Sequence, residues 1–85
     1  MKKKLETFIN KLHSVGFIQC STGASNWYEY YGNGRSVFVG IMAHEIDYLG
    51  HIPIEVNYLD DDADEEVEKD YLTIAGAWKA INQLI

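Results

Sequence analysis

The sequence has little of several residue types and patterns that would point to a particular class of protein. Cys20 is the only cysteine among 85 residues, which excludes an internal disulfide and favours a reducing compartment such as the cytoplasm. No stretch approaches the roughly 18 consecutive apolar residues that a membrane-spanning helix needs. The basic residues 2–4 precede an amphipathic stretch rather than an apolar run, so no export signal is expected. We therefore expect a soluble, cytoplasmic protein without a membrane role.

Motifs for catalysis or cofactor binding are also missing. A phosphate-binding glycine loop is excluded because residues 32–34 lie between two β-rich runs and no helix follows them. Carboxylates are plentiful, but they lie in a solvated run where nothing would separate their pKa values. The residues able to form a nucleophilic or soft-metal site match no known spacing; they are His13, Cys20, His44 and His51. We expect no enzymatic activity, no cofactor and no metal.

What the sequence does contain is enough apolar mass for one core. Hydrophobic residues make up 47% of the chain and aromatic residues 13%, so it can fold without metals or disulfides. Repeats and linkers are lacking, and residues 1–85 are expected to form a single domain.

Two segments have the apolar spacing of amphipathic helices. Near the start, Leu5, Phe8 and Leu12 mark one face of a helix over about residues 2–15, which Gly16 would end. Near the end, large apolar residues recur at steps of three and four. That second stripe predicts a helix that begins within an acidic run and is capped by Asp61 or Asp62; it consists of Val67, Tyr71, Ile74, Trp78, Ile81 and Ile85.

Between these helices the pattern is typical of β-strands. Residues 27–31 and 35–41 flank Asn33-Gly34, the strongest short-range signal for a β-hairpin. A two-residue type I′ turn would place Trp27 opposite Gly40 and so cover the glycine. One face of the hairpin would then carry Tyr28, Tyr30, Val37, Val39 and Ile41. The other face would carry Trp27, Glu29, Tyr31, Ser36 and Phe38.

Two further strands are expected, at residues 17–20 and 52–58. In the second of these, Ile52, Ile54, Val56 and Tyr58 alternate with polar residues and would point inward. Residues 43–51 are left without an assignment, as a loop or an irregular strand extension. The expected fold class is α+β in the order α-β-β-β-β-α, with an antiparallel sheet of three to four strands and both helices packed on one face.

The negative charge is concentrated in one segment. Residues 60–70 hold eight acidic side chains and one lysine, a net −7, which leaves +1 for the rest of a chain whose total is −6. Such a field repels phosphate groups, so neither direct nucleic-acid binding nor attraction to an anionic membrane is expected.

Three interpretations of this acidic segment remain open. Asp60, Asp62 and Asp64 match the start of a calcium loop, but Glu65 replaces its turn glycine and Tyr71 its closing glutamate. In the second interpretation the segment is only a solvated helix start. In the third interpretation it is a recognition surface whose closely spaced charges imitate those of nucleic acid.

The first functional hypothesis is a non-catalytic inhibitor or adaptor that binds a basic site on a partner protein, with a nucleic-acid-binding site as one candidate. In size, acidity and lack of motifs the chain resembles the small anti-defence proteins of phages and mobile elements, and the immunity proteins that cap toxins. The candidate partner-binding residues are Asp60, Asp61, Asp62, Asp64, Glu65, Glu66, Glu68, Trp27, Tyr31 and Phe38. The alternatives are a small homodimeric structural or regulatory domain and a weak metal- or small-ligand-binding domain.

Overall fold

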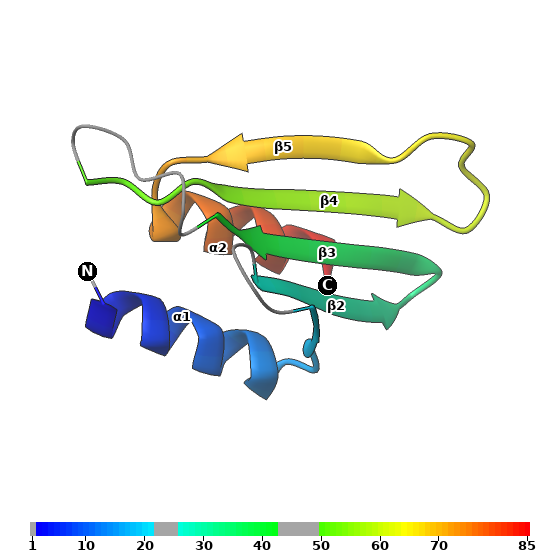
Figure 1. The fold of residues 1–85 in the computed structure, drawn as a ribbon. Helices are drawn as coiled ribbons and strands as arrows, with labels where there is room; N and C mark the ends of the chain where they lie inside the picture. The colour runs from blue at the N-terminus through cyan, green and yellow to red at the C-terminus, as the bar shows by residue number, and fades with distance from the viewer. Residues whose placement is uncertain (1, 22–25, 43–49) are drawn as a thin grey trace.

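The computed structural model describes residues 2–21, 26–42 and 50–85 of the chain. These residues form two α-helices and a five-stranded antiparallel sheet in which each strand pairs with the next along the chain (Figure 1). The elements are α1 (Lys2–Ser14), β1 (Ile18–Ser21), β2 (Asn26–Gly32), β3 (Arg35–Ile41), β4 (Ile54–Asp60), β5 (Val67–Tyr71) and α2 (Ile74–Leu84).

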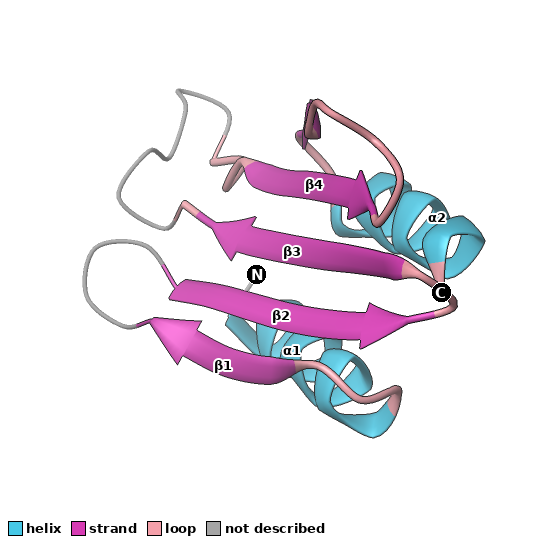
Figure 2. Ribbon diagram, turned by 90° about the vertical axis from the view of Figure 1, so that its right-hand side faces the viewer, coloured by secondary structure: helices cyan, strands magenta, loops and turns pink. Residues whose placement is uncertain are grey.

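Both helices lie behind the same face of the sheet, so the viewer of Figure 2 looks onto the opposite face. The core fills the space between the helices and the sheet. Phe8 and Leu12 from α1 and Ile81 from α2 are at most 1% exposed, as are Val37 and Val39 from the central strand β3. The amphipathic spacing thus identified the inward face of α1, on which Phe8 and Leu12 are buried and Leu5 is half-buried. α1 ends at Ser14, and Gly16 follows it with a φ of 112°, as expected for a glycine that stops a helix.

The β2–β3 hairpin has the register that the Asn-Gly turn predicted. Asn33 and Gly34 have φ of 55° and 73°, both positive as a type I′ turn requires. Every Cα pair from Gly32 with Arg35 to Trp27 with Gly40 is formed as expected. A Cβ atom built on Gly40 would lie 2.7 Å from two atoms of the Trp27 ring, so the indole does cover this glycine.

The second helix starts later than the sequence suggested. Val67 and Tyr71 belong to the strand β5, and α2 begins at Ile74 with Thr73 as its N-cap in place of Asp61 or Asp62. The Thr73 hydroxyl accepts a hydrogen bond from the Gly76 amide at 3.0 Å. A spacing of four residues fits one face of a strand as well as one face of a helix, which is why the apolar stripe was misleading.

The extra strand raises the sheet from the expected three or four strands to five in the described part of the chain. β4 begins and ends two residues later than expected, and its last two residues, Leu59 and Asp60, pair with β3 alone. The expected loop at 43–51 lies outside the described residues apart from Gly50 and His51. Within the described ranges, no helix is long and apolar enough to cross a membrane.

Candidate protein-binding face

The sheet face that neither α1 nor α2 covers is called the open face here (Figure 2). Because side chains alternate along a strand, the cross-strand pairs set its residues in three rows. One row is Trp27, Gly40, Glu55 and Asp70; the second is Ile18, Glu29, Phe38, Asn57 and Glu68; the third is Tyr31, Ser36 and Leu59.

Three aromatic side chains give the open face its apolar area. Trp27 lies over Gly40 and is half-buried, and Phe38 is half-buried on the central strand β3. Tyr31 is 61% exposed, and its hydroxyl donates a hydrogen bond of 2.5 Å to the Asp61 carboxylate. This hydrogen bond and the Asp61 charge raise the pKa of Tyr31 above its ordinary value of 10.0. The ring is therefore held in place although it is exposed.

Carboxylates surround these aromatic side chains. Glu29, Glu55, Glu68 and Asp70 all project from this face. The basic residues of the described strands lie on the other face, where Arg35 stacks 4.9 Å from the Tyr58 ring centroid and Lys69 lies 5.7 Å from that of Tyr71. The open face is therefore uniformly negative across its described strands.

Two features of the open face lower the stability of the protein when no partner is bound. Glu55 lies directly opposite Asp70, and like charges in this position destabilise a strand pair. Asn57 is only 6% exposed, and its Nδ2 donates to Glu55 Oε2 at 2.9 Å. Its Oδ1 has no hydrogen-bond partner within the described residues, and such a buried acceptor costs about 1–3 kcal/mol. Local conflicts of this kind are expected where a surface serves binding rather than folding.

The structure brings together only part of the predicted acidic surface. Trp27, Tyr31, Phe38 and Glu68 lie on the open face, and Asp61 reaches it through Tyr31. Asp60 turns to the helix side, where it forms an ion pair with Arg35. The sequence placed the other predicted acids at the start of the second helix, but they lie in the exposed β4–β5 connection. They are Asp62, Asp64, Glu65 and Glu66.

The predicted site residues left out three carboxylates and one amide of the open face, which are Glu29, Glu55, Asp70 and Asn57. Glu29 was already placed on the outer side of the hairpin, and the alternation in β4 implied that Glu55 and Asn57 point outward. Asp70 was hidden by the incorrect helical assignment. Applying the same alternation of inward and outward side chains to β2, β3, β4 and β5 would have placed these residues on the open face.

The remaining candidates do not form a second site in the described residues. His13 Nδ1 lies 3.1 Å from the Phe17 carbonyl oxygen, and its ring packs edge-on against Tyr28. Cys20 is an exposed free thiol on β1. No group of three or more potential metal ligands gathers within the ranges the structure describes. His44 lies outside those ranges.

The open face therefore offers aromatic rings, carboxylates and hydrogen-bond acceptors, which are groups suited to recognition of a basic surface. The chain was compared with protein-family models, with curated proteins and with solved structures, and none of these comparisons gave a match.

Proposed function

We propose that this protein is a non-catalytic binding module, an inhibitor or adaptor that docks its open face onto a basic site of a partner protein. The observation that carries the proposal is the combination of Trp27, Tyr31 and Phe38 with four carboxylates on a sheet face that neither helix covers. Aromatic anchors dominate binding energy at interfaces, while complementary charges accelerate association.

The conflicts within this face support the same conclusion. A basic side chain from a partner placed between Glu55 and Asp70 would replace their repulsion with attraction. Binding would thus relieve a cost that the free protein bears.

A nucleic-acid-binding groove is the kind of basic site that fits this surface best. Duplex DNA presents closely spaced negative charges on a rigid frame, and an antiparallel sheet is also a rigid frame. The acidic β4–β5 connection, at residues 61–66, extends the negative surface beyond the sheet. A homodimer through the open face is disfavoured, because it would bring the carboxylates of two copies together.

The test is affinity capture from source-cell lysate with two matched variants. The open-face variant carries Glu29→Gln, Glu55→Gln, Glu68→Gln and Asp70→Asn. The connection variant carries Asp62→Asn, Asp64→Asn, Glu65→Gln and Glu66→Gln and loses the same number of charges. Both should fold, which circular dichroism would check.

We expect the wild type to capture a partner at low salt and to lose most of it at high salt. The connection variant should retain the partner, whereas the open-face variant and Trp27→Ala should not. Equal capture by the open-face variant would refute the proposal. Loss in the connection variant alone would move the binding site to residues 61–66.

A further inference from the structure

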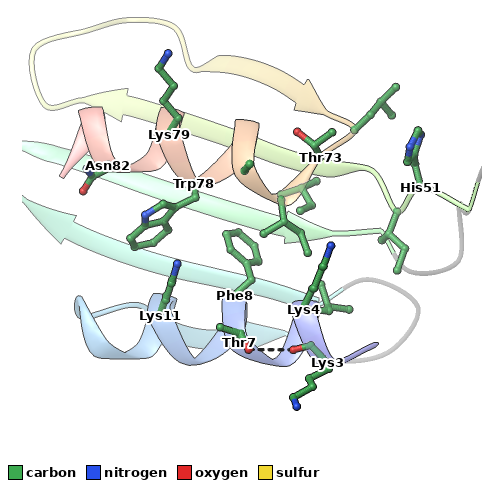
Figure 3. Close-up of a pocket in the computed structure, with 16 residues that line it drawn as sticks. Lys3, Lys4, Thr7, Phe8, Lys11, His51, Thr73, Trp78, Lys79 and Asn82 are labelled. Atoms are coloured by element: carbon green, nitrogen blue, oxygen red, sulfur yellow. Dashed lines mark hydrogen bonds between the residues drawn. The ribbon is translucent and has the colours of Figure 1, made fainter. Parts of the chain in front are cut away.

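A second surface lies on the opposite side of the molecule, between α1 and α2. It is a groove of about 1120 Å³, larger than the roughly 300–1,000 Å³ that usually hold small ligands (Figure 3). Its lining runs from Lys3 to Lys11 on α1 and from Ile74 to Asn82 on α2. The groove is separate from the open face and does not depend on its proposed role.

The inner surface of the groove is apolar. Phe8 and Trp78 meet at its centre in an edge-to-face contact with ring centroids 6.4 Å apart. Phe8 is 1% exposed, so the deepest part is recessed below the helix surfaces. The apolar lining consists of Leu5, Phe8, Ile52, Ile54, Leu72, Ile74, Ala75 and Trp78.

Basic side chains border this apolar surface. No aspartate or glutamate lines the groove among the described residues. Four of the seven lysines and arginines of the chain do line it: Lys3, Lys4, Lys11 and Lys79. Figure 3 shows Lys4 and Lys11 pointing from α1 towards α2. The Lys11 ammonium group lies 5.5 Å from the centroid of the Trp78 ring. A positive border in a protein of net charge −6 favours an anionic ligand.

We propose that this groove binds an amphipathic α-helix with acidic flanks, supplied by a partner protein. The eight-residue separation from Lys3 to Lys11 corresponds to about 12 Å along a helix at 1.5 Å per residue. An apolar stripe at i, i+3, i+4 and i+7 has a similar length and could pack against Phe8 and Trp78. Glutamates along one side of that stripe would meet Lys4 and Lys11, which point from α1 towards α2.

Other occupants fit these features less well. A fatty acid has one carboxylate for four lysines, and a flat membrane surface cannot reach a recessed residue such as Phe8. The acidic segment 60–66 of a second copy has only one apolar residue, Ala63, and could not fill the apolar interior. A helix satisfies both the apolar and the charged parts of the groove.

Trp78 provides a direct measurement of binding. The chain has two tryptophans, so Trp27→Phe leaves Trp78 as the only fluorescent indole. The probe is a synthetic 14-residue helical peptide, a length of about 21 Å, with leucine at i, i+3, i+4 and i+7 and glutamate on both flanks. A second peptide with lysine in place of every glutamate is the control. We expect a saturable change in Trp78 fluorescence with the acidic peptide, weakened by salt, and none with the basic peptide.

Lys11→Glu and Lys69→Glu are a matched pair for locating the site. Each lysine lies over an aromatic ring, at 5.5 Å and 5.7 Å, but only Lys11 lines this groove. Lys11→Glu should lower the affinity for the acidic peptide by about tenfold, while Lys69→Glu should change this affinity by less than about twofold. Urea unfolding would verify that both variants are folded.

Three results would overturn the proposal. The first is no saturable binding of the acidic peptide, and the second is equal binding of the basic peptide. The third is that palmitate or anionic phosphatidylserine vesicles change Trp78 fluorescence at a lower concentration than the acidic peptide does, or that self-association of the chain at assay concentration prevents the peptide from binding.

Discussion

Gly40 and Trp27 face each other across β2 and β3, and the indole occupies the space that a side chain at position 40 would need. A Cβ at this position would lie 2.7 Å from the Trp27 ring and from the terminal methyl carbon of Met42. Gly40→Ala should therefore lower the free energy of unfolding by about 1–3 kcal/mol, the usual cost of overpacking. Urea denaturation measures this change.

The Trp27→Ala background supplies the control for this substitution. Removing the indole should restore most of the loss caused by Gly40→Ala, because the Met42 side chain is flexible and can move. Equal destabilisation in both backgrounds would show that the indole is not what restricts position 40.

Tyr31 and Asp61 offer a test of a single hydrogen bond on the open face. The Asp61 carboxylate raises the pKa of Tyr31 above 10.0, and Asp61→Asn should lower that pKa again. Because the raised pKa favours the protonated phenol in the folded state, this stabilising contribution is present below pH 10.0 and is lost as pH rises through the raised value. An NMR titration of tyrosine labelled at Cζ measures both pKa values, and no difference between the two proteins would exclude the bond in solution.

At the scale of elements, α2 is capped by Thr73 and not by an aspartate of the acidic segment, so substitutions at the two places should differ in their effect on stability. Thr73 caps the helix through its hydroxyl, whereas Asp62 lies in the β4–β5 connection, far along the chain from the helix start. Thr73→Ala should cost about 1 kcal/mol of stability, the typical value for loss of an N-cap. Asp62→Asn should leave stability within about 0.5 kcal/mol of the wild type.

Urea unfolding of the two variants also tests the assignment of β5. If Asp62→Asn proved more destabilising than Thr73→Ala, the helix would begin in the acidic segment and residues 67–71 would not form a strand.

At the scale of the whole molecule, charge is divided between two sides. The open face carries carboxylates, whereas the groove between α1 and α2 carries lysines. Under the two proposals made above, the molecule would contact a basic partner and an acidic helix at the same time, because the sheet and its core separate the two surfaces.

This division predicts how stability depends on salt. The open-face variant with four amides should be more stable than the wild type at low salt, by about 0.2–1 kcal/mol for the opposed Glu55–Asp70 pair. The difference should shrink at high salt, where exposed charges are screened. Thermal unfolding at two salt concentrations measures it, with the connection variant as control. An open-face variant less stable than the wild type at low salt would mean that its carboxylates support the fold rather than oppose it.

The sequence by itself determined the local elements whose signals do not depend on distant residues. The spacing of Leu5, Phe8 and Leu12 defined α1, and Asn33-Gly34 defined the register of β2 and β3. From that register followed the position of Trp27, Tyr31 and Phe38 on one face, because alternation along a strand leaves no other choice.

Only the tertiary structure decided whether residues 67–71 form a helix or a strand, and with that choice which side chains belong to the open face. Val67 and Tyr71 fit a helix and a strand equally well by spacing, and pairing with β4 selects the strand. That pairing turns Glu68 and Asp70 towards Glu55 and Asn57, side chains that the sequence does not relate to one another. The groove between α1 and α2 likewise exists only because two helices distant in sequence pack side by side on one sheet.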